Sequence, residues 1–222
     1  MSKLLTAAAL VLFPMVSHAQ TFPVPEGCSG IVTVQQRGCV LVNVWQCEAD
    51  PEGDKWIALF GEVGLVSVQH VDSEFQWLEA FKRSGDETLE QPAPDPASMT
   101  ELLENGLDTF EFVIKKSETA ERNVGYDSLT GLDVIIDDEP LLQTEYEGKT
   151  LAMDGTVLYE GAGRQFVSAK HRIFFFGQSW DAATPDQVTD LSPVEFLYPD
   201  EAGFFSSTPK FECGVIESRF AG

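Results

Sequence analysis

Hydrophobic and polar residues alternate along most of this chain, and short groups of turn-forming residues separate the alternating segments. Alternation with a period of two is the pattern of a β-strand that buries one face. In the first third of the chain, the segments recur at intervals of about 8–12 residues, which is typical of an antiparallel meander. The strands predicted there are residues 31–35, 39–48, 55–61, 65–71 and 75–81.

One helix is predicted to interrupt the strands, at residues 96–105. Asp95 is a favourable N-cap, Pro96 suits the first helical position, and Gly106 provides a stop. Its apolar stripe, at three- and four-residue spacing, consists of Met99, Leu102 and Leu103. A helix of about ten residues is not stable alone in water, so we expect it to pack on a sheet.

The second half of the chain again predicts strands. Asp154-Gly155 indicates a hairpin, and Gly161-Ala162-Gly163 is interpreted as a turn. Before the helix, residues 84–94 are interpreted as a surface loop. Breaks are also expected at residues 128–131 and 137–140. The predicted strands are residues 109–115, 123–127, 132–136, 141–146, 150–153, 156–160, 164–168, 171–177, 193–198 and 211–216.

These elements predict a mainly β (α+β) fold in a single domain, residues 20–222, with a loose leader at 20–27. So many strands must curl or split, because a flat sheet would expose its edges. A curved antiparallel sheet or half-barrel with the helix across its mouth fits the order of elements. A two-sheet β-sandwich fits the turn spacing equally well.

The first nineteen residues have the pattern of a secretory signal peptide. Lys3 precedes a short apolar run, and Ser17-His18-Ala19 is a cleavage site of the small-x-small type. The run is too short to span a bilayer, and no later run is long enough to do so. We therefore expect a soluble exported protein, periplasmic or extracellular, that begins at Gln20.

Export favours disulfides for the four cysteines of the mature chain. Cys39 and Cys47 lie on one predicted strand, about 26 Å apart, far beyond the roughly 7 Å that a bridge spans. A hairpin turning at Arg37-Gly38 places Cys28 opposite Cys47, which leaves Cys39 for Cys213. The alternative pairing, Cys28–Cys39 with Cys47–Cys213, requires a turn between β-branched residues.

The formal net charge is −22, and cleavage of the signal segment removes one further positive charge, that of Lys3. Such an acidic surface repels phosphate backbones and anionic headgroups, so we expect neither nucleic-acid nor membrane binding. The cysteine spacings lack a C-x₂-C pair, and mature histidines are only His70 and His171, so no metal and no cofactor are predicted.

Motifs of enzyme catalysis are absent from the sequence: it contains no G-x-S-x-G, H-E-x-x-H, P-loop or G-x-G-x-x-G. No catalytic residue is therefore assigned. Glycoside hydrolysis needs two carboxyl groups about 5–10 Å apart. Among 36 acidic residues, the sequence alone selects no pair. A hydrolase of envelope material that uses a carboxylate pair or His171 remains an alternative.

The aromatic residues suggest a second kind of site. Several of them, together with the helix stripe, could line an apolar cavity beneath the helix, with the stripe as a lid. The candidates are Trp45, Met99, Leu102, Leu103, Phe174 and Phe176. The leading hypothesis is a non-enzymatic carrier of an apolar small molecule or an envelope protein partner. A structural component of an envelope assembly is a third hypothesis.

Overall fold

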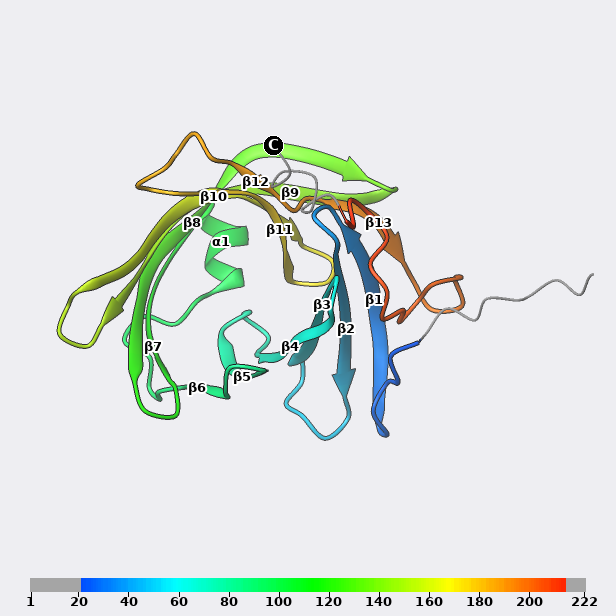
Figure 1. The fold of residues 1–222 in the computed structure, drawn as a ribbon, viewed down its shortest axis with the longest axis horizontal. Helices are drawn as coiled ribbons and strands as arrows, with labels where there is room; N and C mark the ends of the chain where they lie inside the picture. Colours follow the sequence, from blue (N-terminus) through cyan, green and yellow to red (C-terminus); the bar gives the residue numbers. More distant parts are fainter. Residues whose placement is uncertain (1–20, 215–222) are drawn as a thin grey trace, which may run out of the picture.

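The computed structural model describes residues 21–214, and within them thirteen strands form one open antiparallel sheet. The sheet is a meander: each strand pairs with its neighbour in the chain, except that β13 pairs with β1. The mainly β fold is therefore confirmed, in its curved-sheet form and not as a sandwich (Figure 1). The strands are β1 (Cys28–Gln36), β2 (Val40–Cys47), β3 (Lys55–Gly61), β4 (Gly64–Val71), β5 (Trp77–Lys82), β6 (Glu87–Leu89), β7 (Leu107–Lys115), β8 (Ala120–Ile136), β9 (Glu139–Ala152), β10 (Val157–Ser168), β11 (Ile173–Asp181), β12 (Thr189–Asp190) and β13 (Pro193–Leu197).

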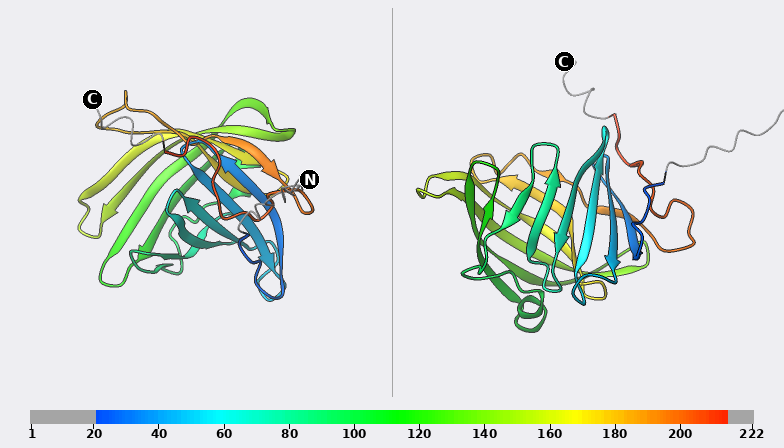
Figure 2. Two further views of the ribbon diagram at one scale, coloured as in Figure 1. Left: turned by 45° about the vertical axis from the view of Figure 1, so that its right-hand side comes forward. Right: turned by 90° about the horizontal axis from the view of Figure 1, so that it is seen from below.

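The curl of the sheet brings its two edges side by side. The edge strands β12 and β13 are separated in the chain by only Leu191 and Ser192. The Leu191 amide donates to the Gly177 carbonyl of β11, whereas the Ser192 carbonyl accepts from the Arg37 amide next to β1. The strands consequently follow one another around a concave interior (Figure 2).

Strands β1 and β2 have both faces covered. Their concave face carries Val32, Val34, Val42 and Val44, which pack with Phe166 and Phe175 from the opposite wall. Such burial of aliphatic and aromatic side chains provides the main stabilising free energy of the domain.

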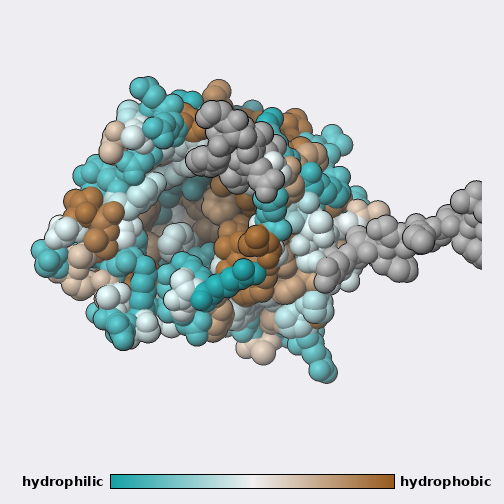
Figure 3. Space-filling view, in the orientation of Figure 1, coloured by the Kyte–Doolittle hydropathy of each residue, from teal (hydrophilic) through white to brown (hydrophobic). Residues whose placement is uncertain are grey.

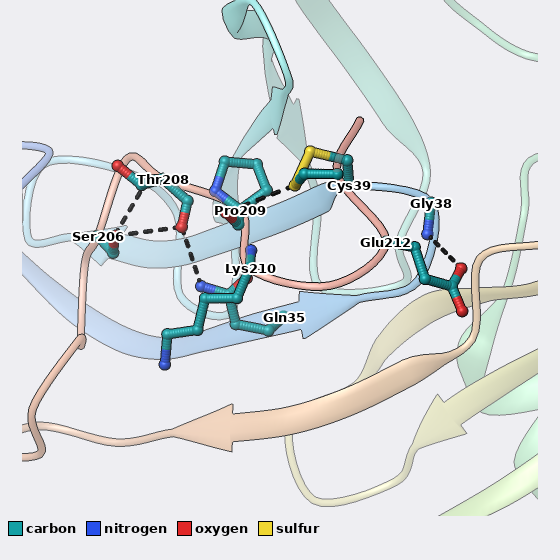
Figure 4. The surroundings of a disulfide bond; sticks show 9 residues. Gln35, Gly38, Cys39, Ser206, Thr208, Pro209, Lys210 and Glu212 are labelled. Carbon is teal, nitrogen blue, oxygen red and sulfur yellow. Dashed lines mark hydrogen bonds between the residues drawn. A yellow bond between two sulfur atoms is a disulfide. The ribbon is translucent and has the colours of Figure 1, made fainter. Parts of the chain in front are cut away.

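The convex face of β1 and β2 binds the C-terminal segment through buried polar side chains. Thr33 accepts from the Phe205 amide at 2.7 Å, and Asn43 donates to the Ser206 carbonyl at 2.8 Å. Gln35 accepts from the Lys210 amide at 2.9 Å and donates to the Thr208 carbonyl (Figure 4). These polar groups are fully buried, and their side chains satisfy the backbone of a segment that forms no strand.

Trp45 also lies on the convex face, beneath the two terminal segments. Its ring centroid is 5.7 Å from that of Phe22 and 6.3 Å from that of Phe205. Phe22 belongs to the leader that was expected to be loose, and its amide donates to the Phe205 carbonyl. The leader therefore differs from the prediction at this point, because its aromatic ring covers the sheet.

Both disulfides have the predicted pairing, Cys28–Cys47 and Cys39–Cys213. The second one ties the β1–β2 turn to the C-terminal segment, where Glu212 also accepts from the Gly38 amide (Figure 4). The predicted signal peptide, residues 1–19, and the end of the strand predicted at 211–216 lie outside the described residues. Residues 211–214 form bends and a turn and not a strand.

Helix α1 (Met99–Asn105) lies on the concave side of the sheet (Figure 1). It begins three residues later than predicted, because Ser98 and not Asp95 is the N-cap and accepts from the Glu101 amide. Asp95 instead forms a bridge with Glu111 of β7. The predicted stop is correct: Gly106 has φ 79°, in the left-handed region.

Two predicted interruptions of the second half are absent from the structure. β8 continues through residues 128–131 with a register shift between Leu129 and Asp133, and β10 runs through Gly161-Ala162-Gly163. Before the helix, the predicted loop at 84–94 contains a three-residue strand, β6, which pairs with β5 and with β7. The resulting long strands place glycines in the middle of the sheet instead of in turns, and this determines the shape of the concave face.

Candidate functional site

A half-open cavity of about 290 Å³ lies on the concave face, between the walls of the curved sheet. A second hollow, of about 600 Å³, lies next to it. In the space-filling view, the surface is hollowed on this side and hydrophobic residues lie at the hollow (Figure 3). The two share the side chains of Leu59, Ser67, Gln69, Trp77 and Phe176. We call them together the concave cavity.

A row of glycines forms part of the cavity wall. Gly125 of β8 pairs with Gly148 of β9, which in turn pairs with Gly161 of β10. Three adjacent strands therefore lack a side chain at the same level of the concave face. Aromatic rings occupy the space next to the glycines: a Cβ on Gly125 would lie 2.7 Å from Phe110, and one on Gly161 would collide with Tyr159.

Two carboxyl groups lie side by side in the next row of the same wall. Asp108 of β7 pairs directly with Asp127 of β8, and Asp127 pairs with Tyr146 of β9. Asp127 and Tyr146 lie two residues from the glycines of their strands, so they share the glycine face. All three side chains line the cavity.

Burial without a compensating cation raises the pKa of both carboxyl groups. Asp108 is 4% exposed; its Oδ2 accepts from the Ser98 amide at 3.0 Å, and its Oδ1 has no hydrogen-bond partner. Desolvation raises the pKa of Asp108 to about 6. Desolvation, with the nearby charge of Asp108, raises the pKa of Asp127 to about 7, and its Oδ1 also has no partner.

Gln36, at the end of β1, brings a third unsatisfied polar group to the cavity. Its side chain is fully buried, and neither Nε2 nor Oε1 has a hydrogen-bond partner. It lines the cavity from β1, which lies six strands from β7 in the sheet. A buried amide with no partner is costly, and groups of this kind in a native protein are often completed by a ligand or water.

Helix α1 is fixed against the cavity through Glu74, in the β4–β5 connection. The Glu74 carboxylate accepts from the Thr100 amide at 2.7 Å and from the Thr100 hydroxyl at 2.8 Å. Arg172, in the β10–β11 turn, donates to the same carboxylate at 2.8 Å. These hydrogen bonds lower the pKa of Glu74 against the effect of its burial. The helix is thus bound to two connections of the sheet.

Of the six residues expected at a cavity, three line it and three do not. Met99, Phe174 and Phe176 line the cavity. Leu102 and Leu103 do not line it and pack against Val167, in a hydrophobic cluster that also contains Met99 and Phe174. Trp45 lies on the opposite face of the sheet, so its placement at a cavity is corrected. The side chains of β2 alternate between the two faces of the sheet as predicted. Both faces are buried, so burial of Trp45 does not place it at the cavity.

His171, the alternative catalytic candidate, lies in a buried polar cluster. Its Nε2 is 3.3 Å from the Tyr198 hydroxyl and 3.7 Å from Glu139 Oε1. Glu139 also accepts from the Ser168 and Tyr198 hydroxyls. Desolvation lowers the pKa of His171, and burial with the Glu139 hydrogen bond raises that of Tyr198. None of these side chains lines the concave cavity.

Sequence reasoning missed Asp108, Asp127 and Gln36. Their signals are faint: two acids among 36, and one of two adjacent glutamines at the end of a strand. Only the register between β7 and β8 brings the two carboxyl groups together.

Comparisons with protein-family models, with curated protein sequences and with solved structures gave no significant match for this chain. Across residues 21–214, no helix has the length and apolar character required to cross a membrane. In the same part of the chain, no group of three or more His, Cys, Asp or Glu residues is arranged to hold a metal ion.

Proposed function

We propose that this protein is an exported, non-enzymatic binding protein that holds an apolar ligand in its concave cavity. The observation that carries this proposal is the row Gly125, Gly148 and Gly161. Glycine is unfavourable in the interior of a strand, where it has no side chain to pack. Three of them in register remove side chains from one level of the wall, so that the rings of Phe110 and Tyr159 lie against the strand backbone and line the cavity.

The dimensions and chemistry of the cavity support a small amphiphilic ligand. Its first part, about 290 Å³, is near the lower end of the usual range of about 300–1,000 Å³ for ligand pockets. The adjoining hollow of about 600 Å³ provides room for a longer body. Trp77 and Phe176, which are 43% and 40% exposed, are shared by both parts and offer apolar surface to such a body.

Native mass spectrometry of protein purified from its own exported fraction tests the binding function. We expect an additional small apolar mass that is released by denaturing extraction. Gly148→Leu should abolish it, because a Cβ at Gly148 has no neighbour closer than 3.8 Å and the longer side chain would fill the cavity. Glu147→Leu adds the same side chain on the other face of β9, where Glu147 is exposed, and should retain the ligand. An apo mass together with no uptake of added alkyl probes would contradict the proposal.

Export is proposed from the signal pattern of residues 1–19 and is supported by the two disulfides, which persist in oxidising compartments. Cell fractionation followed by N-terminal sequencing tests it. The mature protein should lie outside the cytoplasm and begin at Gln20 with no free thiol. A cytoplasmic protein that retains Met1 would contradict the export proposal.

The carboxyl pair favours a hydrolase as the second candidate function. Side chains directly opposite in an antiparallel pair have Cβ atoms about 4.5–5.5 Å apart, a spacing compatible with two acids acting on one bond. Raised and unequal pKa values, about 6 for Asp108 and about 7 for Asp127, suit an acid and a base at neutral pH. Fluorogenic umbelliferyl glycosides and esters would detect turnover, which Asp108→Asn and Asp127→Asn should each abolish. An unchanged rate in both variants would remove this candidate.

A further inference from the structure

We propose that the ligand of the concave cavity carries a primary ammonium group that binds between Asp108 and Asp127. This inference deepens the proposed binding function and rests on it. It starts from two unpartnered oxygens, Oδ1 of Asp108 and Oδ1 of Asp127, on side chains that are adjacent in register. An ammonium group has three donors and no acceptor, so it can satisfy both oxygens at once.

The surroundings of the pair are acidic. The charges that act on Asp108 come from Glu101 of α1, from Asp95 and from Glu74. Arg172, next to Glu74, already donates to that carboxylate. Like charges raise the free energy of the ionised pair, and a bound cation would lower it. The protein therefore disfavours an anionic head group at this place.

Lys149, which belongs to the lining of the 290 Å³ part of the concave cavity, does not neutralise the pair. The Lys149 Nζ lies 2.9 Å from Glu160 Oε1, and that ion pair is half-exposed. Tyr146 and Tyr159 face the cavity from β9 and β10. The pKa of Tyr146 is raised, by burial first and then by Tyr159 and Asp127, so its hydroxyl remains a neutral hydrogen-bonding group.

Gln36 provides an independent indication that the cavity is completed by a polar ligand. It is 0% exposed, both polar atoms of its amide are unpartnered, and it lines the cavity from the opposite part of the sheet. Phe110, Phe175 and Phe176 line the same cavity. The ligand that fits these features has an ammonium head, an apolar body and a hydrogen-bonding group along that body.

The head group should be bound in a pH-dependent way. At pH 5 the carboxyl pair is largely protonated, because its pKa values are raised to about 6 and 7. At pH 8 it is ionised. The other groups that face it are Glu74, Glu101 and Asp95, with Tyr146. Affinity for an ammonium compound should rise between pH 5 and 8, whereas affinity for an uncharged compound of the same length should change little.

The experiment compares decylammonium, decanol and decanoate, each below its micelle-forming concentration, by calorimetry on the full mature chain. We expect decylammonium to bind at least about tenfold more tightly than decanol at pH 8, and decanoate to bind most weakly. Asp108→Asn and Asp127→Asn should each reduce this preference to about twofold while decanol still binds. Asp186→Asn, on an exposed loop, should change nothing.

Gly148→Leu tests the binding function separately from the ammonium preference. Because its side chain fills the cavity, it should prevent binding of all three probes. If decanol binds to the original protein and decylammonium binds no better, the ammonium inference is wrong and the binding function stands. If the Asn variants retain the full preference, the ammonium group is held elsewhere and the inference is also wrong. If none of the probes binds the folded protein, the proposed function itself fails.

Discussion

Asp137 Oδ2 lies 2.8 Å from the backbone nitrogen of Phe196, and this hydrogen bond joins the β8–β9 hairpin to the edge strand β13. The hairpin passes over one end of the curved sheet to reach that edge (Figure 1). Next to the same turn, Glu139 accepts from the Tyr198 hydroxyl just beyond β13. The buried polar cluster around His171 thus ties the β8–β9 and β10–β11 connections to the edge of the sheet at β13.

Asp137→Ala should therefore destabilise the protein, by about 1–3 kcal/mol. The variant loses the acceptor of the Phe196 amide, and it places alanine at φ 49°, in the left-handed region. Asp137→Asn keeps an acceptor oxygen and tolerates this conformation, so it is the matched control and should lose little. Urea denaturation followed by tryptophan fluorescence measures both. Equal losses for Ala and Asn would show that the hydrogen bond is not what matters.

The disulfides should contribute unequally to stability. Cys39–Cys213 closes a sequence separation of 174 residues, and Cys28–Cys47 one of 19. The chain-entropy model gives about 5 and about 3 kcal/mol for such loops. We expect the double variant Cys39→Ala/Cys213→Ala to be the less stable of the two double-alanine variants, by about 2 kcal/mol. Denaturant unfolding of both checks this, and the reverse order would contradict it.

The disulfide pairing was predicted from a β1–β2 register that differs from the observed register. The β1–β2 connection contains one more residue than a two-residue turn, since Gln36 pairs with Val40 and not with Cys39. A register shift between Gly30 and Val32 then absorbs the additional residue, so that Cys28 still pairs with Cys47. The exclusion of a Cys39–Cys47 bridge depended only on strand length, and it was correct for that reason.

The mainly β fold, the helix stop and both disulfides were thus predictable from local patterns, whereas the choice between a curved sheet and a sandwich was left open. The cavity was not predictable, because it depends on register over several strands. Gly161 and Gly163 were interpreted as a turn, since glycine is common in turns. Their actual role depends on Gly125 and Gly148, which are distant in sequence and align only in the folded sheet.

Alanine substitution should change the stability of the protein differently at Gly125 and at Gly148. A Cβ on Gly125 would lie 2.7 Å from Phe110 and would also collide with the backbone oxygen of Glu147. Gly125→Ala should therefore cost about 2–4 kcal/mol. A Cβ on Gly148 has open space to 3.8 Å. Gly148→Ala should be neutral or stabilise by up to about 1 kcal/mol, since it restricts the unfolded chain.

Thermal unfolding of the two variants in parallel tests this difference. Comparable melting temperatures would mean that the sheet relaxes around residue 125, and the close approach of Gly125 to β9 would then not be a constraint. The same pair is informative for binding. Gly148→Ala retains most of the cavity and should still take up ligand, unlike the larger leucine variant.

Asp127 should make the protein less stable as the pH rises. Its pKa is raised from 3.8 to about 7, so the folded state holds the proton more tightly than the unfolded state does. The stabilising contribution of the protonated form is complete below about pH 4, and it is lost as the pH rises through 7. Asp127→Asn mimics the neutral form. It should match the original protein at pH 4 and exceed its stability at pH 8 by on the order of 1–3 kcal/mol.

Urea denaturation at pH 4, 6 and 8 measures this difference, with Asp186→Asn as the exposed control that should follow the original protein throughout. A constant difference between the original protein and Asp127→Asn at all three values would show that Asp127 is not held in its neutral form. Decylammonium added at pH 8 should reduce the advantage of Asp127→Asn, because the bound cation replaces the missing partner of the carboxylate. The same carboxyl pair that lowers the stability of the empty protein is then the group that selects its ligand.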